Sequence, residues 1–313
     1  MRAIVTGAAG FIGSHLCEHL LAQGDEVIGI DNLTDFYDQA RKEGNLAPLR
    51  ARRWFTFWRD DILALPLESV FAGADVVYHL AGHPGVRNSW GAEFAVYVER
   101  NILVTHRVLE AARRGTCRIV YASSSSVYGD AEAYPTAETV RPQPVSPYGV
   151  TKLAAEHLCE TYRTAFGVPV AALRLFTVYG PRQRPDMAFS RLVAAACEDR
   201  AFQMYGDGEQ SRDFTYVGDV VAAMRLAALS SWTGVANIGG GGHITMNQVL
   251  AIIGELTGPV RVWHRPHQPG DARHTAADIT LARDAFGYRP RTSVREGLAA
   301  MVEAERTAWA AAR

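Results

Sequence analysis

Short apolar runs alternate with segments of helical periodicity along most of this chain. The runs at 3–6, 26–31 and 74–82 are rich in Val, Ile and Ala, which is typical of strands buried on both faces of a parallel sheet. Between the first two runs, residues 14–24 carry apolar side chains at helical spacing and end on a glycine. This alternation predicts an α/β fold with a doubly wound parallel sheet of the Rossmann type.

Further segments continue the same alternation. Residues 60–62 are expected to end a third strand, and residues 118–129 to contain another strand followed by the serines. Residues 101–114 and 146–162 carry apolar stripes at helical spacing, and we expect the first of these helices to begin at Asn101. The pattern therefore predicts strands and helices in regular succession over the first half of the chain.

A glycine turn, "GAAGFIG", follows the first predicted strand and places glycines at 7, 10 and 13. Gly7 permits a tight turn, Gly10 lets the backbone approach a pyrophosphate, and Gly13 allows close packing of helix on strand. The second strand ends at Asp31, where an acid can bind both ribose hydroxyls and repel a 2′-phosphate. A glycine turn without a ligand is the alternative, but the flanking strand, helix and acid favour NAD.

The predicted cofactor site extends beyond the glycine turn. Asp61 and Ile62 could meet the adenine, and the strand over 74–82 ends in small residues that suit close approach to a cofactor. Asn101 is expected to support the cofactor loop. The residues predicted to contact NAD are Gly7, Gly10, Phe11, Ile12, Gly13, Asp31, Asn32, Asp61, Ile62, Leu80, Ala81, Gly82, Asn101, Tyr148 and Lys152.

Tyr148 and Lys152 lie four residues apart, and so on one face of their predicted helix. A tyrosine titrates near ~10, too high to act as a base at neutral pH. We expect the Lys152 ammonium and the positive nicotinamide ring to lower the pKa of Tyr148, and Lys152 also to reach the nicotinamide ribose. A surface pair is the alternative, since this spacing is common; its place after a dinucleotide fold and a serine-rich strand end favours catalysis.

The segments "TGAAGFIG", "SSSSVYG" and "YGVTK", in this order and spacing, resemble the extended short-chain dehydrogenase/reductase family. The segments at 212–221 and 237–241 extend the resemblance over nearly the whole chain, and those at 31–38 and 176–187 make it most similar to the nucleotide-sugar 4-epimerases, the UDP-glucuronate 4-epimerases among them. The resemblance implies an NAD-dependent isomerase that interconverts UDP-glucuronate and UDP-galacturonate through a 4-keto intermediate. The catalytic residues it implies are Ser124, Tyr148 and Lys152.

Four hydroxyl side chains stand together at 123–126 with no acid among them. In the family's 4,6-dehydratases an Asp-Glu pair follows the position of Ser124, and in its UDP-glucuronate decarboxylases a glutamate stands at the position of Ser126. The hydroxyls of Ser125 and Ser126 can bind sugar or carboxylate oxygens, but they are poor acids and bases at neutral pH. The resemblance therefore favours hydride transfer out and back over a lyase reaction.

A uronate substrate needs its carboxylate held. Ser125, Thr177 and Arg184 are candidates, because a guanidinium can bind a carboxylate by two parallel bonds, and Arg182 and Arg87 compete for the role. The resemblance implies that arginines contact the diphosphate and that the strand containing Gln203 lies beside the uracil. The predicted substrate residues are Arg87, Ser124, Ser125, Ser126, Tyr148, Thr177, Arg184, Gln203, Tyr205, Arg212 and Arg273.

The resemblance also implies two interwoven domains. Residues 1–172 plus 213–242 are expected to bind NAD, and residues 173–212 plus 243–313 to form a smaller mixed α/β domain for the nucleotide sugar. The helices at 101–114 and 146–162 are rich in apolar residues and could pair across a two-fold axis, so we expect a homodimer.

Composition limits the remaining alternatives. The net charge of −1 comes from 32 basic and 33 acidic residues without a basic stripe, which disfavours nucleic acid as a partner. The four cysteines and ten histidines lack metal-ligand spacing, so we predict no metal and reduced thiols. Neither a signal peptide nor a bilayer-length apolar run is expected, so we predict a cytoplasmic protein. A UDP-glucose-type 4-epimerase, a decarboxylase or dehydratase on this scaffold, and a non-catalytic NAD sensor stay open.

Overall fold

Seven parallel strands form the central sheet of the computed structural model, which describes residues 1–266 and 272–311. The strand order is β11-β6-β5-β4-β1-β2-β3, so the chain winds outward from β1 in one direction and from β4 in the other. This doubly wound order confirms the predicted fold class. The strands are β1 (Arg2–Thr6), β2 (Glu26–Ile30), β3 (Phe55–Trp58), β4 (Val76–His79), β5 (Arg118–Ser124), β6 (Val170–Leu175) and β11 (Gly234–Ile238).

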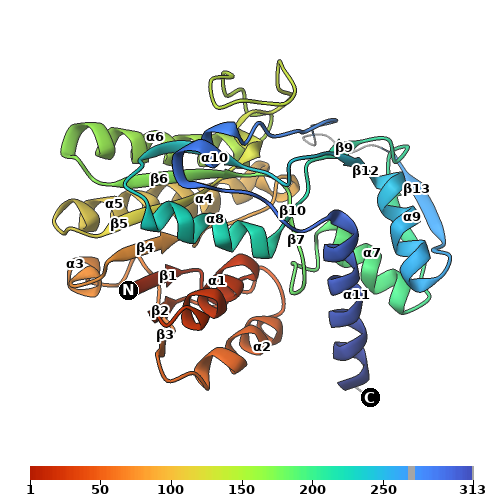
Figure 1. Ribbon diagram of the computed structural model, residues 1–313, viewed down its shortest axis with the longest axis horizontal. Helices are drawn as coiled ribbons and strands as arrows, with labels where there is room; N and C mark the ends of the chain where they lie inside the picture. The colour runs from red at the N-terminus through yellow and green to blue at the C-terminus, as the bar shows by residue number, and fades with distance from the viewer. Residues whose placement is uncertain (267–271, 312–313) are drawn as a thin grey trace.

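Helices cover both faces of this sheet (Figure 1). Leu16 and Leu20 of α1 are buried against one face together with α2 and α8, and Val108 and Leu109 of α5 are buried against the other together with α3 and α6. Each large apolar side chain that leaves water contributes roughly 1.5–3 kcal/mol, so two apolar layers hold the sheet. The helices are α1 (Phe11–Ala22), α2 (Gln39–Arg50), α3 (Leu67–Phe71), α5 (Val104–Arg113), α6 (Pro147–Phe166) and α8 (Val217–Leu229).

Two predicted boundaries are wrong. Asn101 does not begin a helix, because the helical backbone starts at α4 (Phe94–Tyr97) and passes through a π-helical segment, Val98–Leu103, before α5. The wider π turn changes which side chains face inward, and it buries Asn101 to 2% exposure. The third strand ends at Trp58, so Asp61 lies in the loop that follows, where three consecutive charged residues can stay hydrated.

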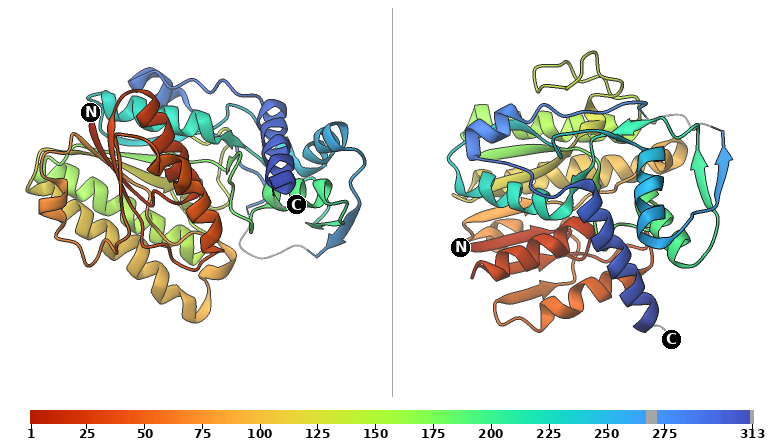
Figure 2. Two further views of the ribbon diagram at one scale, coloured as in Figure 1. Left: turned by 90° about the horizontal axis from the view of Figure 1, so that it is seen from below. Right: turned by 45° about the vertical axis from the view of Figure 1, so that its right-hand side comes forward.

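The rest of the chain forms a smaller layer beside the sheet (Figure 2). Phe189, Val249, Ile253 and Leu298 form a separate apolar core there, in which α11 packs on α7 and α9. Residues 213–242 return to the large sheet as α8 and β11. The elements of this part are β7 (Val178–Tyr179), α7 (Ala188–Cys197), β8 (Phe202–Tyr205), β9 (Ser211–Arg212), β10 (Thr215–Tyr216), β12 (Ile244–Thr245), α9 (Met246–Thr257), β13 (Val262–Arg265) and α11 (Val294–Ala311). Helix α10 (Thr280–Phe286) lies instead against the large sheet.

Within residues 1–266 and 272–311, no helix combines the length and the apolar character that crossing a bilayer requires. The same residues contain no group of three or more His, Cys, Asp or Glu side chains placed to hold a metal ion. The predicted domain division stays a prediction; α10 contacts β11 and contributes Ala282 to the core of the large sheet.

Candidate active site

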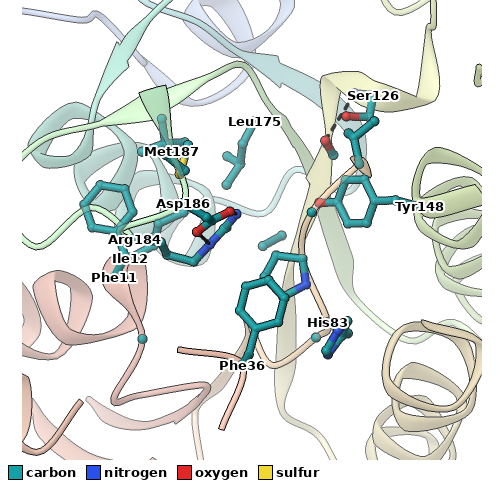
Figure 3. Close-up of a pocket in the computed structure, with 18 of the residues that line it drawn as sticks. Phe11, Ile12, Phe36, His83, Ser126, Tyr148, Leu175, Arg184, Asp186 and Met187 are labelled. Atoms are coloured by element: carbon teal, nitrogen blue, oxygen red, sulfur yellow. Dashed lines mark hydrogen bonds and ion pairs between the residues drawn. The ribbon is translucent and has the colours of Figure 1, made fainter. Parts of the chain in front are cut away.

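A cavity of about 1000 Å³ opens at the carboxyl ends of β1, β4 and β5, where the strand order reverses. Open α/β sheets bind their ligands at this edge. All the predicted site residues lie in the described part of the chain, and Arg273 alone among them is not part of the cavity lining. Figure 3 shows Tyr148 and Ser126 on one side of the cavity, with Arg184 and Asp186 on the other. The fold thus brings the separate sequence segments together.

The glycine turn leaves no room for a side chain at Gly7 or Gly13. Gly7 has a φ of +72°, and a Cβ on Gly13 would lie 2.1 Å from the Gly7 carbonyl oxygen. No side chain caps α1, whose N-cap is Gly10, so the first N–H groups of that helix are available to an anion at the cavity wall. The turn therefore fits the pyrophosphate of a dinucleotide.

Asp31 stands at the end of β2, where the adenosine ribose of a dinucleotide would lie. Its carboxylate accepts bonds from the backbone N–H groups of Ala9 at 3.1 Å and Leu33 at 2.8 Å, which fix its orientation. Burial raises the pKa of Asp31, and the Leu33 N–H bond and the nearby Lys42 ammonium oppose that rise. The sequence did not single out Lys42, which donates to the Thr34 carbonyl oxygen at 2.7 Å.

The end of the cavity lined by Asp61 contains a residue that the sequence analysis missed. Arg100 donates to Asp61 Oδ2 at 2.5 Å, and Asn32 donates to the same oxygen at 3.2 Å. Asp61 Oδ1 accepts from the Leu63 N–H group at 2.9 Å. A single arginine on a helix carries no periodic signal, so its pairing with Asp61 could be found only in the folded chain.

Asn101 holds the loop that follows β4. Its side-chain oxygen accepts from the His83 N–H group at 2.7 Å, and its amide donates to the His83 carbonyl oxygen at 3.1 Å and to Thr151 Oγ1 at 3.0 Å. The buried amide therefore ties the loop to α6, the helix that carries Tyr148 and Lys152.

Tyr148 and Lys152 share a face of α6, but they are not arranged as predicted. Lys152 Nζ donates to the Ala122 carbonyl oxygen at 2.6 Å and lies 4.4 Å from the centre of the Tyr121 ring. Burial raises the pKa of Tyr148, and only the Ser124 hydrogen bond and the charge of Arg184 oppose that rise. The predicted lowering of this pKa by Lys152 is therefore wrong for the ligand-free protein, because the ammonium points at the backbone of β5.

An aromatic wall continues from Tyr148 along the cavity. The ring centre of Tyr148 lies 6.3 Å from that of Tyr97. The ring centre of His83 lies 4.6 Å from that of Tyr97 and 4.8 Å from that of Phe36. Burial lowers the pKa of His83, so a neutral ring faces the cavity. The sequence analysis missed Phe36 and His83, since aromatic residues in loops give no periodic pattern.

The serine segment rests on a buried polar network. Ser123 Oγ donates to Glu156 at 2.8 Å, Arg174 binds the same carboxylate at 2.5 Å and donates to the Tyr128 oxygen at 2.7 Å, and Tyr128 donates to Asn237 at 2.8 Å. These residues tie together β5, β6, β11 and α6. Ser123 thus serves the scaffold, while the Ser124 oxygen accepts from the Ser126 N–H group at 3.1 Å.

The three candidate arginines for a carboxylate point in different directions. Arg184 lines the cavity and binds Asp186 with two parallel bonds of 3.0 and 2.9 Å. Arg182 has a φ of +65° and instead binds Glu18 of α1 at 2.5 Å, so its proposed competition for the role is not supported. Arg87 lines the cavity with its guanidinium 4.7 Å from the centre of the Tyr205 ring.

The outer end of the cavity carries further positive charge. Arg191, which the sequence analysis missed because an arginine on a helix usually faces solvent, lies 5.8 Å from the Tyr205 ring centre. Arg212 lines the cavity and donates to the Arg273 carbonyl oxygen at 2.9 Å. The side chain of Arg273 is 69% exposed and faces Asp207 at 3.6 Å, so solvent rather than the cavity surrounds it.

Comparisons with known proteins agree with this geometry. Residues 3–239 match the family described as the NAD dependent epimerase/dehydratase family. A Bacillus subtilis protein called an uncharacterized UDP-glucose epimerase, YtcB, is 43% identical over 95% of this chain and 96% of its own length. A UDP-glucuronate 4-epimerase of Thermodesulfobacterium geofontis is 37% identical over 94% and 93%.

A solved structure is similar over the whole fold. The UDP-glucuronic acid 4-epimerase of Bacillus cereus, in complex with UDP-glucuronic acid and NAD, superposes with a TM-score of 0.95 at 41% identity, over 98% of this chain and 100% of that one. The predicted short-chain dehydrogenase/reductase relationship, NAD as cofactor and an epimerase acting on nucleotide sugars are thereby confirmed. The chain belongs to the NAD dependent epimerase/dehydratase family.

Proposed function

We propose that this enzyme interconverts UDP-glucuronate and UDP-galacturonate by inverting C4 through a transient 4-keto sugar. The observation that carries the proposal is the presence of Tyr148 and Arg184 in one cavity, where the charge of Arg184 also acts on the Tyr148 hydroxyl. A phenol suits proton exchange at O4, and a guanidinium suits a carboxylate at C6. The similarity to the Bacillus cereus enzyme, whose structure holds UDP-glucuronic acid, supports the same substrate.

Proton handling at O4 falls to Tyr148 and Ser124. As a phenolate, which the positive ring of a bound nicotinamide would stabilise, Tyr148 accepts the proton of the sugar O4, and as a phenol it later returns that proton. Ser124, whose hydrogen bond also favours the phenolate, holds O4 and relays the proton. A bound NAD would supply the acceptor for the C4 hydride and the donor that returns a hydride to the opposite face of the sugar. Burial lowers the pKa of Lys152 to about 8, so the side chain stays mainly protonated at pH 7 and can hold a ribose hydroxyl.

The sugar must turn between the two half-reactions while its nucleotide stays bound. Arg87, Arg191 and Arg212 surround the outer cavity and suit the diphosphate. Gln203 and Tyr205 of β8 lie beside them and suit the uracil. Thr177 and Ser125 line the cavity where they can hold the carboxylate with Arg184. Restraining that carboxylate keeps the 4-keto uronate, a β-keto acid, from losing carbon dioxide.

A decarboxylase or dehydratase fits the site less well. Ser125 and Ser126 occupy the positions where the resemblance to those lyases would require acids. Glu156 lies close to this segment, but it is buried to 3% exposure and bound by Arg174 at 2.5 Å. A carboxylate committed to a buried arginine is a poor proton donor or acceptor for a sugar.

A UDP-glucose 4-epimerase is the second candidate. It is favoured by the Arg184–Asp186 pair, which leaves this part of the cavity without net charge, and by the similarity to the Bacillus subtilis protein. The two candidates differ in how much they depend on Arg184. Replacing Arg184 by Gln should weaken UDP-glucuronate roughly tenfold or more and UDP-glucose much less, since only the uronate carries a charge for the guanidinium.

The test is incubation of the purified protein with UDP-glucuronate or UDP-glucose, first without and then with added NAD, followed by proton NMR of the products. UDP-galacturonate from UDP-glucuronate supports the proposal. Conversion of UDP-glucose alone would establish the second candidate, and release of carbon dioxide would establish a lyase. Tyr148→Phe should abolish turnover, whereas Tyr134→Phe, on an exposed loop, should not. Bound NAD without any turnover would indicate a sensor.

We also propose that the enzyme is a homodimer. Val98 and Leu103 of the π-helical segment and Val150 of α6 are apolar side chains with 38%, 46% and 46% exposure. Helix α6 contacts that segment, so these side chains lie on neighbouring elements that a second copy could cover. Light scattering after size exclusion should give twice the chain mass, and Leu103→Glu with Val150→Glu should give the monomer. A monomeric wild-type protein would contradict the proposal.

A further inference from the structure

Arg184 already binds a carboxylate in the geometry that a uronate would require. Its Nε lies 3.0 Å from Asp186 Oδ1, and its Nη2 lies 2.9 Å from Asp186 Oδ2. Both side chains line the cavity, and Figure 3 shows the pair on the side opposite Tyr148. Two parallel N–H···O bonds are the strongest way for a guanidinium to hold a carboxylate. Asp186 thus occupies the edge of Arg184 best suited to a substrate carboxylate.

A uronate carboxylate that binds Arg184 must either displace Asp186 or lie beside it. If this C6 carboxylate takes the Nε–Nη2 edge of Arg184, Asp186 loses both bonds. If it takes the other edge, two carboxylates lie close to one cation and repel each other. A neutral hexose meets neither problem, because the pair carries no net charge and the C6 hydroxyl can bond to either partner.

We propose that Asp186 is a specificity-determining residue whose carboxylate competes with the C6 carboxylate of the sugar for Arg184. The inference rests on the proposed function, since it assumes that Arg184 receives the sugar end of the nucleotide sugar. Asp186 lowers the affinity for uronates relative to neutral hexoses, and thereby sets how far the enzyme distinguishes the two classes. It acts on binding and not on the proton transfer at O4.

The exposure of the pair sets the size of the effect. The Arg184 side chain is 19% exposed and that of Asp186 is 47% exposed, so water screens their attraction. Ion pairs of this kind contribute little to stability, which allows a substrate to break them; their typical strengths correspond to about a two- to fivefold change in a dissociation constant. Asp186 therefore tunes the preference without blocking uronates.

The test compares Asp186→Asn with a matched control, Glu198→Gln. Glu198 also lies two residues from its arginine and accepts from Arg200 Nε at 2.5 Å, but neither residue lines the cavity. Dissociation constants of UDP-glucuronate, UDP-glucose and UDP are measured by calorimetry at saturating NAD. In Asp186→Asn we expect the value for UDP-glucuronate to fall about two- to fivefold and the other two values to stay within a factor of two. Glu198→Gln should change none of them.

The decisive comparison repeats the Asp186→Asn substitution in an enzyme that lacks Arg184. In an Arg184→Gln background, Asp186→Asn should no longer lower the dissociation constant of UDP-glucuronate, because there is no guanidinium for which the two carboxylates could compete. Equal changes for UDP-glucuronate and UDP-glucose, weaker binding of UDP-glucuronate, or a gain that persists without Arg184 would each overturn the inference. The unchanged UDP constant shows that each variant is folded.

Binding measurements separate this inference from the proposed function. If the wild-type enzyme does not epimerise UDP-glucuronate but Asp186→Asn tightens it selectively, the proposed function fails and the role of Asp186 stands. If the enzyme epimerises UDP-glucuronate and Asp186→Asn leaves the ratio of the two constants unchanged, the proposed function stands and the role of Asp186 fails.

Discussion

At the glycine turn, a single methyl group on Gly13 would approach the Gly7 carbonyl oxygen to 2.1 Å, whereas across the cavity the Arg184 guanidinium is held by one half-exposed carboxylate. The cofactor half of the cavity, the part formed by the glycine turn and the loop after β4, consists of backbone and buried amides such as Asn101. The sugar half, the part formed by residues 177–212, presents long arginines from loops and helix α7.

This difference decides what each half can tolerate. Backbone packed at contact distance has one arrangement, so a substitution there either fits or destroys the site. An arginine side chain has many rotamers and can bind any of several carboxylates with similar strength. A substitution in the sugar half therefore changes the populations of these alternative contacts. We therefore expect all-or-none effects in the cofactor half and graded effects in the sugar half.

Gly13→Ala should have the largest effect. The added Cβ cannot avoid the Gly7 backbone, so the turn must open at a cost of more than about 3 kcal/mol, and NAD binding should be lost. Calorimetric titration with NAD and thermal unfolding measure the two effects. Gly44→Ala is the control, because a Cβ there meets nothing within 4 Å; in helix α2 it should stabilise the protein by roughly 0.5–1 kcal/mol. Wild-type NAD affinity in Gly13→Ala would contradict the expectation.

Glu156→Gln comes next, because it breaks a buried ion pair beneath the serine segment. Glu156 and Arg174 are 3% and 5% exposed, and removing one partner of such a pair costs roughly 3–5 kcal/mol. Urea unfolding measures the loss. The matched variant on the same helix is Glu160→Gln, whose pair with Arg163 is solvent-exposed at 42% and 33% and should be worth less than about 1 kcal/mol. Equal losses in the two variants would remove the distinction.

The cofactor half was also the half that the sequence predicted well. Gly7, Gly10 and Gly13 lie where the motif requires them, and Asp31 follows β2 directly, because spacing along the chain fixes a strand, turn and helix locally. Tyr148 and Lys152 share a helix face for the same reason. The relation of Lys152 to the phenol was not predictable, because it depends on the Ala122 carbonyl oxygen thirty residues earlier.

The sugar half shows where spacing stops being informative. Arg182 and Arg184 are separated by one residue, yet the left-handed backbone at Arg182 sends its side chain to α1 while Arg184 enters the cavity. Arg273 carries the right charge but faces Asp207 and solvent. Asp186 lies two residues after Arg184 in the segment 176–187, and only the folded geometry reveals its bidentate bond. Loop conformation, which local patterns do not encode, decides these contacts.

Asp213 follows the sugar half directly in the chain, but its surroundings resemble those of the cofactor half, because buried backbone groups hold its side chain. It is fully buried, and its carboxylate accepts from the backbone N–H groups of Gly240 at 2.5 Å and Ala277 at 3.2 Å. Burial raises the pKa of Asp213 from 3.8 to about 6. Because the folded state therefore binds this proton more tightly, the stability it adds is complete below pH 3.8 and is lost as the pH rises through 6.

That titration predicts a measurable difference between wild type and Asp213→Asn. From pH 5 to pH 7.5 the free energy of unfolding should fall by about 1.4 kcal/mol more in wild type than in Asp213→Asn, which cannot titrate. Urea unfolding at the two pH values measures this difference, in which the other carboxylates cancel. The same pH dependence in both proteins would show that Asp213 has an ordinary pKa.

Arg182→Gln should have the smallest effect, and it tests whether Arg182 positions the sugar half or contacts the sugar. Arg182 binds Glu18 of α1 at 2.5 Å, at 25% and 38% exposure, and also contacts His15, whose pKa burial and Arg182 lower to about 4. The Glu18 bond is a charged contact between this loop and the helix that follows the glycine turn. Two neutral partners join the same loop and helix, because Arg182 donates to Ser14 Oγ at 3.3 Å and His15 Nε2 lies 2.8 Å from the Pro181 carbonyl oxygen. Losing a half-exposed pair should raise the KM values for UDP-glucuronate and UDP-glucose equally, by about threefold, with kcat unchanged.

Glu18→Gln should reproduce that change, and the double variant should add nothing further, because both substitutions remove the same bond. Steady-state kinetics with UDP-glucuronate and UDP-glucose measure the KM and kcat values that test this expectation. A loss confined to UDP-glucuronate would return Arg182 to the role of carboxylate ligand, and would mean that this loop rearranges when the sugar binds. Equal losses would place Arg182 at the joint between the two halves, where a bond made outside the cavity fixes the conformation from which Arg184 reaches into it.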